Sequence, residues 1–398
     1  MNTPLARKSG GATRRWGFFG LLGSGNIGND GTFEALLGYV RRRHPDVDLV
    51  CVCPGHEHVM SRYGVETTPM HWYAEGSGFG LVAKAFGKLV DAFRTFRWIG
   101  GLDAVLIPGM GVLEATLPLN PWGFPYALLL VCVAGRLRGT KVALVSVGAA
   151  DTRQPVTRRV IAASARLADY RSYRDDLSKR AVTRMGVDTS NDDVYVDLAF
   201  ALPTPEPRDT GRPTVGVGVM TYFGTSLERR RSTEIHEAYV TKMRRFVTWL
   251  TGEGYRVRLF TGDPADDAVT SVILADHPDG LVVAEPTTSL GELMRQMAGV
   301  DFVVASRYHN VLSALKLAKP VIAIGYAEKN DALMARMGMG EFSESIRTFE
   351  VDKLIQRFCD LVDQREQLRD RMLEGNRLNE RLLDRQFAAL SAELRTEG

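Results

Sequence analysis

Short apolar segments alternate with amphipathic segments along most of this chain, and this alternation limits the folds open to it. Residues 16–22 are predicted to form a strand, and a helix follows in which Phe33, Leu36 and Val40 recur at helical spacing. Strands that alternate with helices indicate parallel sheets with crossover helices. Further strands are predicted at residues 47–53, 102–109, 140–149, 214–220, 255–263, 280–286, 300–306 and 319–326.

A proline-rich segment divides this pattern into two halves. Residues 202–213 contain four prolines and one glycine, which is typical of a linker. The predicted fold is therefore α/β, with two Rossmann-like lobes, a cleft between them where ligands bind, and a helical C-terminus. The predicted units are a basic tail (1–15), a first lobe on the acceptor side (16–202), a linker (203–213), a second lobe on the donor side (214–350) and C-terminal helices (351–398).

The C-terminal segment is predicted to be helical and only partly packed. Leu354, Phe358 and Leu361 mark a packed face near its start. We expect the more charged remainder to be mainly a solvated helix, with an interaction arm as the alternative.

Composition narrows the function classes. A net charge of +3 over 398 residues does not favour a nucleic-acid partner. Four cysteines do not make a disulfide framework, which indicates a reduced, cytoplasmic protein. The basic N-terminus is expected to be a loose tail, with peripheral attraction to an anionic membrane surface as the alternative. Its paired arginines before an apolar run resemble a twin-arginine export signal, but the run breaks after about eight residues. No stretch is apolar for long enough to span a membrane.

A glycine loop follows the first predicted strand. Gly23, Gly25 and Gly28 match the dinucleotide fingerprint G-x-G-x-x-G. The acidic residue expected at the end of the second strand is missing, because Pro54 and Gly55 follow that strand directly. Three interpretations remain: a substrate-facing loop, close packing without a ligand, and dinucleotide binding, with the first favoured.

The start of a helix in the second half is the sharpest candidate for a ligand site. A buried strand is predicted to end at Ala305, and a helix to open with Ser306 as its N-cap. Arg307 and His309 fall in its first turn, where free backbone N–H groups also attract anions. The segment therefore predicts a phosphate or carboxylate site, although a surface arginine and a capping histidine would give the same pattern.

Four segments, in order, resemble the polysaccharide pyruvyl transferase family. Residues 305–334 resemble its Arg-x-His helix start and the Pro-Val-aliphatic-Tyr-x-x-Lys run that follows. Residues 25–30 resemble its Asn-x-Gly-Asp loop, residues 102–113 its strand and glycine turn, and residues 170–188 its Arg-Asp-x-x-Ser helix. The chain departs from the pattern in three places: Asn29 stands where aspartate is usual, Met110 interrupts the glycines, and Tyr308 replaces a leucine.

The resemblance implies a GT-B-like enzyme that moves a pyruvyl group from phosphoenolpyruvate to two hydroxyls of a sugar and releases phosphate. The sugar would belong to a glycan or glycolipid precursor, either free in the cytoplasm or lipid-linked at the inner face of the membrane. His309 and Arg174 map to the catalytic and donor-binding positions. The further implied donor-binding residues are Ser306, Arg307, Tyr308 and Lys329, and the implied acceptor-binding residues are Asn26, Asn29 and Asp30.

Other functions remain open at this stage. A nucleotide-sugar glycosyltransferase of the same fold would need an acid in a ribose pocket, for which Glu328 is a weak candidate. A non-catalytic sugar-phosphate-binding protein would keep the anion site. No cofactor and no metal are expected, since the triplet His56-Glu57-His58 is too local to make a metal site.

Overall fold

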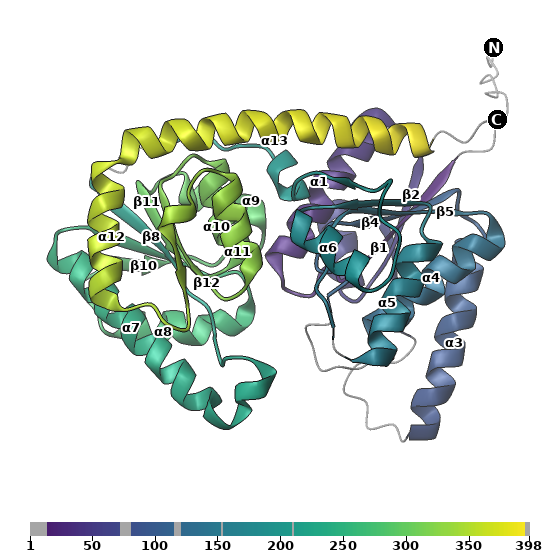
Figure 1. Cartoon of the computed structure of the whole chain (residues 1–398), viewed down its shortest axis with the longest axis horizontal. Coiled ribbons are helices and arrows are strands. Elements are labelled where there is room, and N and C mark those ends of the chain that lie inside the picture. The colour runs from purple at the N-terminus through teal and green to yellow at the C-terminus, as the bar shows by residue number, and fades with distance from the viewer. Residues whose placement is uncertain (1–13, 72–80, 115–120, 153, 209–210, 395–398) are drawn as a thin grey trace, which may run out of the picture.

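Two parallel sheets, each covered by helices, form the body of the molecule (Figure 1). The computed structural model describes residues 14–71, 81–114, 121–152, 154–208 and 211–394. The two-lobe α/β fold predicted from the sequence is confirmed, and helices close the chain.

The first sheet has the strand order of a Rossmann fold. In spatial order it contains β3 (Glu66–Pro69), β2 (Asp48–Cys53), β1 (Arg15–Phe19), β4 (Ala104–Pro108), β5 (Lys141–Val147), β6 (Tyr170–Tyr173) and β7 (Asp193–Val194). Its helices are α1 (Ile27–Arg43), α2 (His56–Tyr63), α3 (Leu81–Ile99), α4 (Phe124–Arg138), α5 (Pro155–Leu167) and α6 (Asp176–Arg184).

The second sheet repeats this order. It contains β10 (Val282–Ala284), β9 (Arg256–Phe260), β8 (Thr214–Gly218), β11 (Phe302–Ala305), β12 (Val321–Gly325) and β13 (Ser343–Ser345), all parallel. Its helices are α7 (Ser232–Gly252), α8 (Asp267–Ala275), α9 (Leu290–Met297), α10 (Tyr308–Lys316) and α11 (Glu328–Arg336). Short 3-10 turns lie at Leu198–Ala201, Ser226–Arg231, Pro264–Asp266 and Gly340–Phe342.

Each sheet has its switch point next to its first strand. In the first sheet β1 pairs with both β2 and β4, and in the second β8 pairs with both β9 and β11. Because the strand order reverses at these points, a crevice opens outside the carboxyl ends of the strands. The segments after β1, β4, β8 and β11 are therefore placed to form a ligand site.

The last helix refines one expectation. Helix α12 (Val351–Asp363) packs through Leu354 and Phe358 as predicted. The following helix α13 (Arg365–Leu394) exposes half of its residues but buries seven of them, and it lies across both lobes (Figure 1). Phe387 stacks on Tyr39 of α1 with ring centroids 4.1 Å apart, and Asn376 donates hydrogen bonds to carbonyl groups at the end of α10. The many charged residues of α13 made its narrow buried stripe difficult to recognise in the sequence.

Candidate functional site

The predicted donor residues gather at the carboxyl ends of strands from both lobes. Arg174 directly follows β6, and His309 lies in the first turn of α10 after β11. Lys329 lies in the first turn of α11 after β12. They meet Glu114 and Asp197, and we call these five residues, Glu114, Arg174, Asp197, His309 and Lys329, the buried charge cluster.

Arg174 is enclosed by carboxylates. Its Nη2 donates to Glu114 Oε1 at 2.9 Å, Nε lies 3.4 Å from Asp175 Oδ2, and Nη1 lies 3.6 Å from Asp197 Oδ2. The side chain is only 3% exposed. A Cβ added to Gly148 would lie 2.6 Å from Arg174 Nη2, so this glycine leaves room for the guanidinium. Arg174 is therefore a buried cation and not the surface ion pair that its helical context also suggested.

Glu114 joins the two lobes electrostatically. Besides its bond to Arg174 of the first lobe, its Oε2 accepts a hydrogen bond from Lys329 Nζ of the second lobe at 3.3 Å. Burial alone would raise the pKa of Glu114, but Lys329 and Arg174 lower it overall. The ionised Glu114 carboxylate therefore pairs with Arg174 and Lys329, the two cations that the sequence predicted to bind the donor.

The His309 ring turns its Nε2 towards Asp197 within the buried charge cluster. Its Nε2 lies 3.9 Å from Asp197 Oδ2, and neither atom has a hydrogen-bond partner among the described residues. Burial lowers the pKa of His309 to about 4; Asp197 opposes this change, while Arg174 and Lys329 add to it. The ring is therefore neutral near pH 7, and burial is the main cause instead of the helix dipole that the sequence suggested.

Tyr308 lies beneath the cations. Its ring centroid is 4.9 Å from Arg174 Cζ and 6.0 Å from Lys329 Nζ, which places both cations over the aromatic ring. Burial, with Asp197 adding to it, raises the pKa of the Tyr308 hydroxyl, so this group stays protonated. The residue that departs from the family pattern thus supports the cations directly.

Ser306 and Arg307 have internal partners. Helix α10 begins at Tyr308 with Arg307 at its N-cap position, so Ser306 is not the N-cap that the sequence suggested. The Ser306 hydroxyl is buried and bonds to the Tyr239 hydroxyl at 3.0 Å. Arg307 forms a two-pronged ion pair with the buried Asp266, at 2.9 and 2.5 Å. Both side chains hold the end of β11 in place.

Asn26, Asn29 and Asp30 shape the glycine loop. Asn26 caps α1 by accepting from the N–H groups of Gly28 and Asn29, and Asn29 Nδ2 donates to the Leu21 carbonyl. Asp30 is buried and accepts from Gly23 N–H at 2.7 Å, where Gly23 has a φ of +67°. Burial raises the pKa of Asp30, and the bond from Gly23 partly offsets this.

Gly28 brings the two lobes into contact. A Cβ added there would lie only 1.9 Å from His309 Nδ1. The third glycine of the G-x-G-x-x-G pattern therefore admits the imidazole ring of the other lobe. The first two glycines border a different space.

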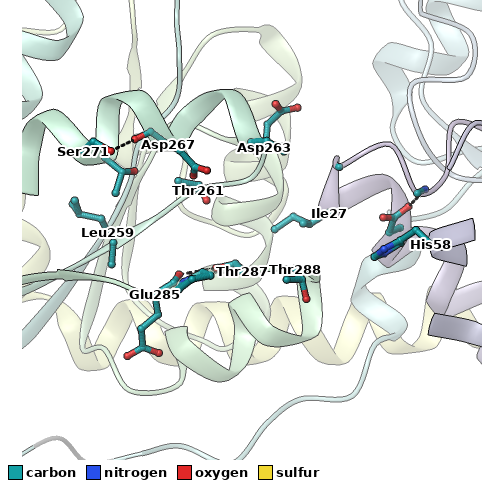
Figure 2. Close-up of a pocket in the computed structure, with 17 residues that line it drawn as sticks. Ile27, His58, Leu259, Thr261, Asp263, Asp267, Ser271, Glu285, Thr287 and Thr288 are labelled. Carbon is teal, nitrogen blue, oxygen red and sulfur yellow. Dashed lines mark hydrogen bonds between the residues drawn. The ribbon is translucent and has the colours of Figure 1, made fainter. Parts of the chain in front are cut away.

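That space is an open cleft of about 570 Å³ between the lobes. Figure 2 shows Ile27 and His58 on one side, facing residues of the second lobe. The labelled second-lobe residues are Leu259, Thr261, Asp263, Asp267, Ser271, Glu285, Thr287 and Thr288. Among the lining residues in the described part of the chain there is no lysine or arginine, and the polar groups are mainly hydroxyls and carboxylates.

Sequence reasoning missed Glu114 and Asp197. Glu114 lies shortly after β4, and Asp197 shortly after β7, at the carboxyl edge of the first sheet. The carboxyl ends of parallel strands meet at this one edge of the sheet. Acidic residues just beyond a strand are therefore as good candidates for the site as the motif residues. Their pairing with second-lobe residues depends on how the lobes face each other, which no local pattern encodes.

Residues 26–328 match the family model of polysaccharide pyruvyl transferase, whereas no curated protein matches the chain significantly. Among solved structures, the UDP-GlcNAc 2-epimerase from Neisseria meningitidis, bound to UDP-GlcNAc, is 10% identical with a TM-score of 0.60 over 96% of this chain and 99% of that chain. S. aureus MnaA in a co-structure with UDP is 13% identical, with 0.58 over 90% of each chain. The glycosyltransferase SnogD from Streptomyces nogalater is 14% identical, with 0.55 over 96% and 99%.

These structural likenesses are at low identity and concern the fold, which is GT-B-like. The family match spans more than half of the chain and includes Gly28, Arg174 and His309. This chain belongs to the polysaccharide pyruvyl transferase family.

Proposed function

We propose that this protein transfers the pyruvyl group of phosphoenolpyruvate to two hydroxyls of a sugar in a glycan or glycolipid precursor, and releases phosphate. The observation that carries the proposal is the buried charge cluster, in which cations from both lobes converge beside a neutral histidine. We further propose a cytoplasmic enzyme, working at the inner face of the membrane where its acceptor is lipid-linked.

The cluster suits a small, highly charged donor. Phosphoenolpyruvate carries a carboxylate and a phosphate, and arginine pairs with such groups through two parallel hydrogen bonds. The cavity beside Arg174, Tyr308 and Lys329 holds only about 20 Å³, roughly one water. We therefore propose that the donor enters by displacing the Glu114 carboxylate from Arg174 and Lys329 as the lobes separate.

The proposed reaction balances without a redox partner. Two C–O bonds form between the donor's C2 and the sugar oxygens, while the C–O bond to phosphate breaks. One hydroxyl proton ends on C3, which becomes a methyl group, and the other leaves with the phosphate. His309 is neutral before the donor binds, and a phosphate dianion beside it favours protonation. We assign it the role of general acid for the departing phosphate.

The open cleft is the proposed acceptor site. Threonine, serine and carboxylate groups such as Thr261, Asp267 and Thr288 can exchange hydrogen bonds with sugar hydroxyls. The start of α1 reaches both places, since Ile27 lines the cleft while Gly28 contacts His309. The acceptor roles of Asn26, Asn29 and Asp30 stay a prediction, which the loop-forming bonds of these residues make indirect.

The acidic cleft favours this proposal over nucleotide-sugar transfer. Lysine and arginine side chains commonly pair with the phosphates of a nucleotide diphosphate, and the described lining residues include neither. Melting scans distinguish the two functions. Phosphoenolpyruvate at a hundredfold excess over its dissociation constant should stabilise the protein by ~2.7 kcal/mol, whereas UDP, GDP and NAD should have little effect.

Acceptor-dependent phosphate release tests the reaction itself. The protein is incubated with phosphoenolpyruvate and a panel of hexosides and lipid-linked saccharides, and phosphate is measured over time. We expect release that requires one of the acceptors and is lost in His309→Gln. Release of UDP from a UDP-sugar would support a glycosyltransferase instead, and tight donor binding without turnover on any acceptor would support a non-catalytic binding protein.

A further inference from the structure

An apolar surface on the outside of the first lobe has no role in the proposed reaction. Helix α3 carries Leu89, Phe93 and Phe96 at helical spacing, and they are 69%, 69% and 36% exposed. Helix α4 adds Val133 and Leu137, which are 37% and 69% exposed. We call these five residues the apolar face. Soluble proteins normally expose large apolar side chains singly, so a group of them on two helices indicates a contact surface.

The two helices hold this face together. The Tyr126 hydroxyl of α4 donates to the Lys88 carbonyl of α3 at 3.3 Å. Further along, the Arg138 guanidinium lies over the Phe96 ring, 4.2 Å from its centroid. Figure 1 shows α3 and α4 on the side of the first lobe that faces away from the second lobe. The apolar face is thus remote from the contact between the lobes and stays accessible while the cluster is closed.

The surroundings of the apolar face are strongly basic. Helices α3 and α4, which carry the apolar face, contain six lysines and arginines and one acid, Asp91. That acid is buried and lies 3.1 Å from His71. The excess of five positive charges on these two helices exceeds the +3 net charge of the whole chain. Arg97, Arg136 and Arg138 are exposed at the border of the apolar face.

We propose that this face docks on an anionic lipid surface. Apolar side chains would enter the interface between headgroups and acyl chains, while the bordering arginines pair with lipid phosphates. None of the helices among the described residues combines the length and apolar character needed to cross a bilayer, so the helices would lie on the surface. A second copy of the chain fits less well, because two basic faces would repel each other. The proposal does not depend on the reaction assigned to the enzyme.

Vesicle flotation tests the proposal with the full-length protein. Vesicles of phosphatidylcholine alone are compared with vesicles containing about one third phosphatidylglycerol, at low and high salt. We expect binding to the anionic vesicles at low salt and at least tenfold weaker binding in the other conditions. Each basic residue near an anionic surface contributes roughly fivefold, so Arg97→Gln with Arg136→Gln should lower binding by roughly 25-fold.

Two apolar variants separate docking from general surface effects. Leu89→Ser combined with Phe93→Ser should abolish most vesicle binding, whereas Leu378→Ser, which changes a 50% exposed leucine on α13, should bind like the wild type. Melting temperatures confirm that each variant is folded. Equal binding to both vesicle types, or unchanged binding in the Leu89 and Phe93 variant, would overturn the proposal. A concentration-dependent dimer that this variant abolishes would assign the face to a second copy instead.

Discussion

The buried charge cluster and the open cleft both contact the start of α1, yet they handle polar groups in opposite ways. In the cluster the side chains of Arg174, Glu114 and Asp197 are 3%, 8% and 1% exposed, and the charges neutralise one another across the lobes. In the cleft, hydroxyls and carboxylates border about 570 Å³ of open space. An anion can therefore bind in the cluster only by replacing an internal partner, whereas the cleft can take a polyhydroxyl ligand directly.

The largest difference should appear in turnover. His309→Gln keeps a polar side chain but removes the titrating ring, and loss of a general acid typically costs about 10²–10⁴-fold in rate. We expect this loss in kcat, with donor affinity lowered by less than about tenfold. His277→Gln, at a histidine outside the cluster, is the matched control. Equal and small effects on both quantities would reduce His309 to a packing residue.

The next largest effect should be a pH dependence of the free energy of unfolding that comes from His309 in the cluster. The pKa of His309 is about 4 in the folded protein and 6.5 ordinarily, so the unfolded chain takes up a proton that the folded chain excludes. The contribution of His309 to the free energy of unfolding is therefore fully present above pH 6.5, and it is lost as the pH falls towards 4. Between pH 7 and pH 5 this residue should cost about 2 kcal/mol of unfolding free energy.

Urea denaturation at the two pH values measures this cost. The pH dependence of His309→Gln should be smaller than that of the wild type by that amount, because glutamine does not titrate. An identical dependence in both proteins would mean that the ring is solvated.

The contact between the lobes can be broken at one glycine. Gly28→Ala places a Cβ 1.9 Å from the His309 ring, so we expect a loss of ~1–3 kcal/mol in stability from overpacking. Gly291→Ala in α9 has nothing within 4 Å of the added Cβ and should be neutral or slightly stabilising. Urea denaturation of both variants gives the comparison. Adding His309→Ala to Gly28→Ala should recover most of the loss, and no recovery would place the strain elsewhere.

Substitution of Glu114 should have a smaller effect, and it should strengthen donor binding. Glu114→Gln removes the carboxylate that competes for Arg174 and Lys329, so phosphoenolpyruvate should bind about tenfold more tightly, while the ligand-free protein melts at a lower temperature. Glu344→Gln removes a carboxylate that pairs with Arg357 outside the cluster, and should leave the affinity unchanged. Calorimetric titration measures both. Weaker binding to Glu114→Gln would make Glu114 a part of the donor site.

The sequence predicted the frame of the molecule better than its charge pairs. The predicted first strands of both halves are the central strands β1 and β8, because buried parallel strands read as continuous apolar runs. The short strands β3, β6, β7 and β13 were missed, since ETTP, YRSY, DV and SES have little apolar character. His309 was found because a buried strand directly precedes its helix.

The partners of these residues were beyond local pattern reading. Asp266 pairs with Arg307 from 41 positions away, and Glu114 reaches Lys329 from 215 positions away. Such pairs follow from the way the two lobes meet, as do the contacts of α13, and neither propensity nor spacing contains that information.

Donor binding by Arg174 is the central claim, and one titration tests it most directly. Phosphoenolpyruvate is titrated calorimetrically into the wild type, Arg174→Lys in the cluster and Asp267→Asn in the cleft, after melting scans confirm that all three are folded. Lysine keeps the charge but loses the planar fork, so we predict at least tenfold weaker binding for Arg174→Lys and less than twofold change for Asp267→Asn. Unchanged binding to Arg174→Lys together with weakened binding to Asp267→Asn would contradict the account and place the donor in the cleft.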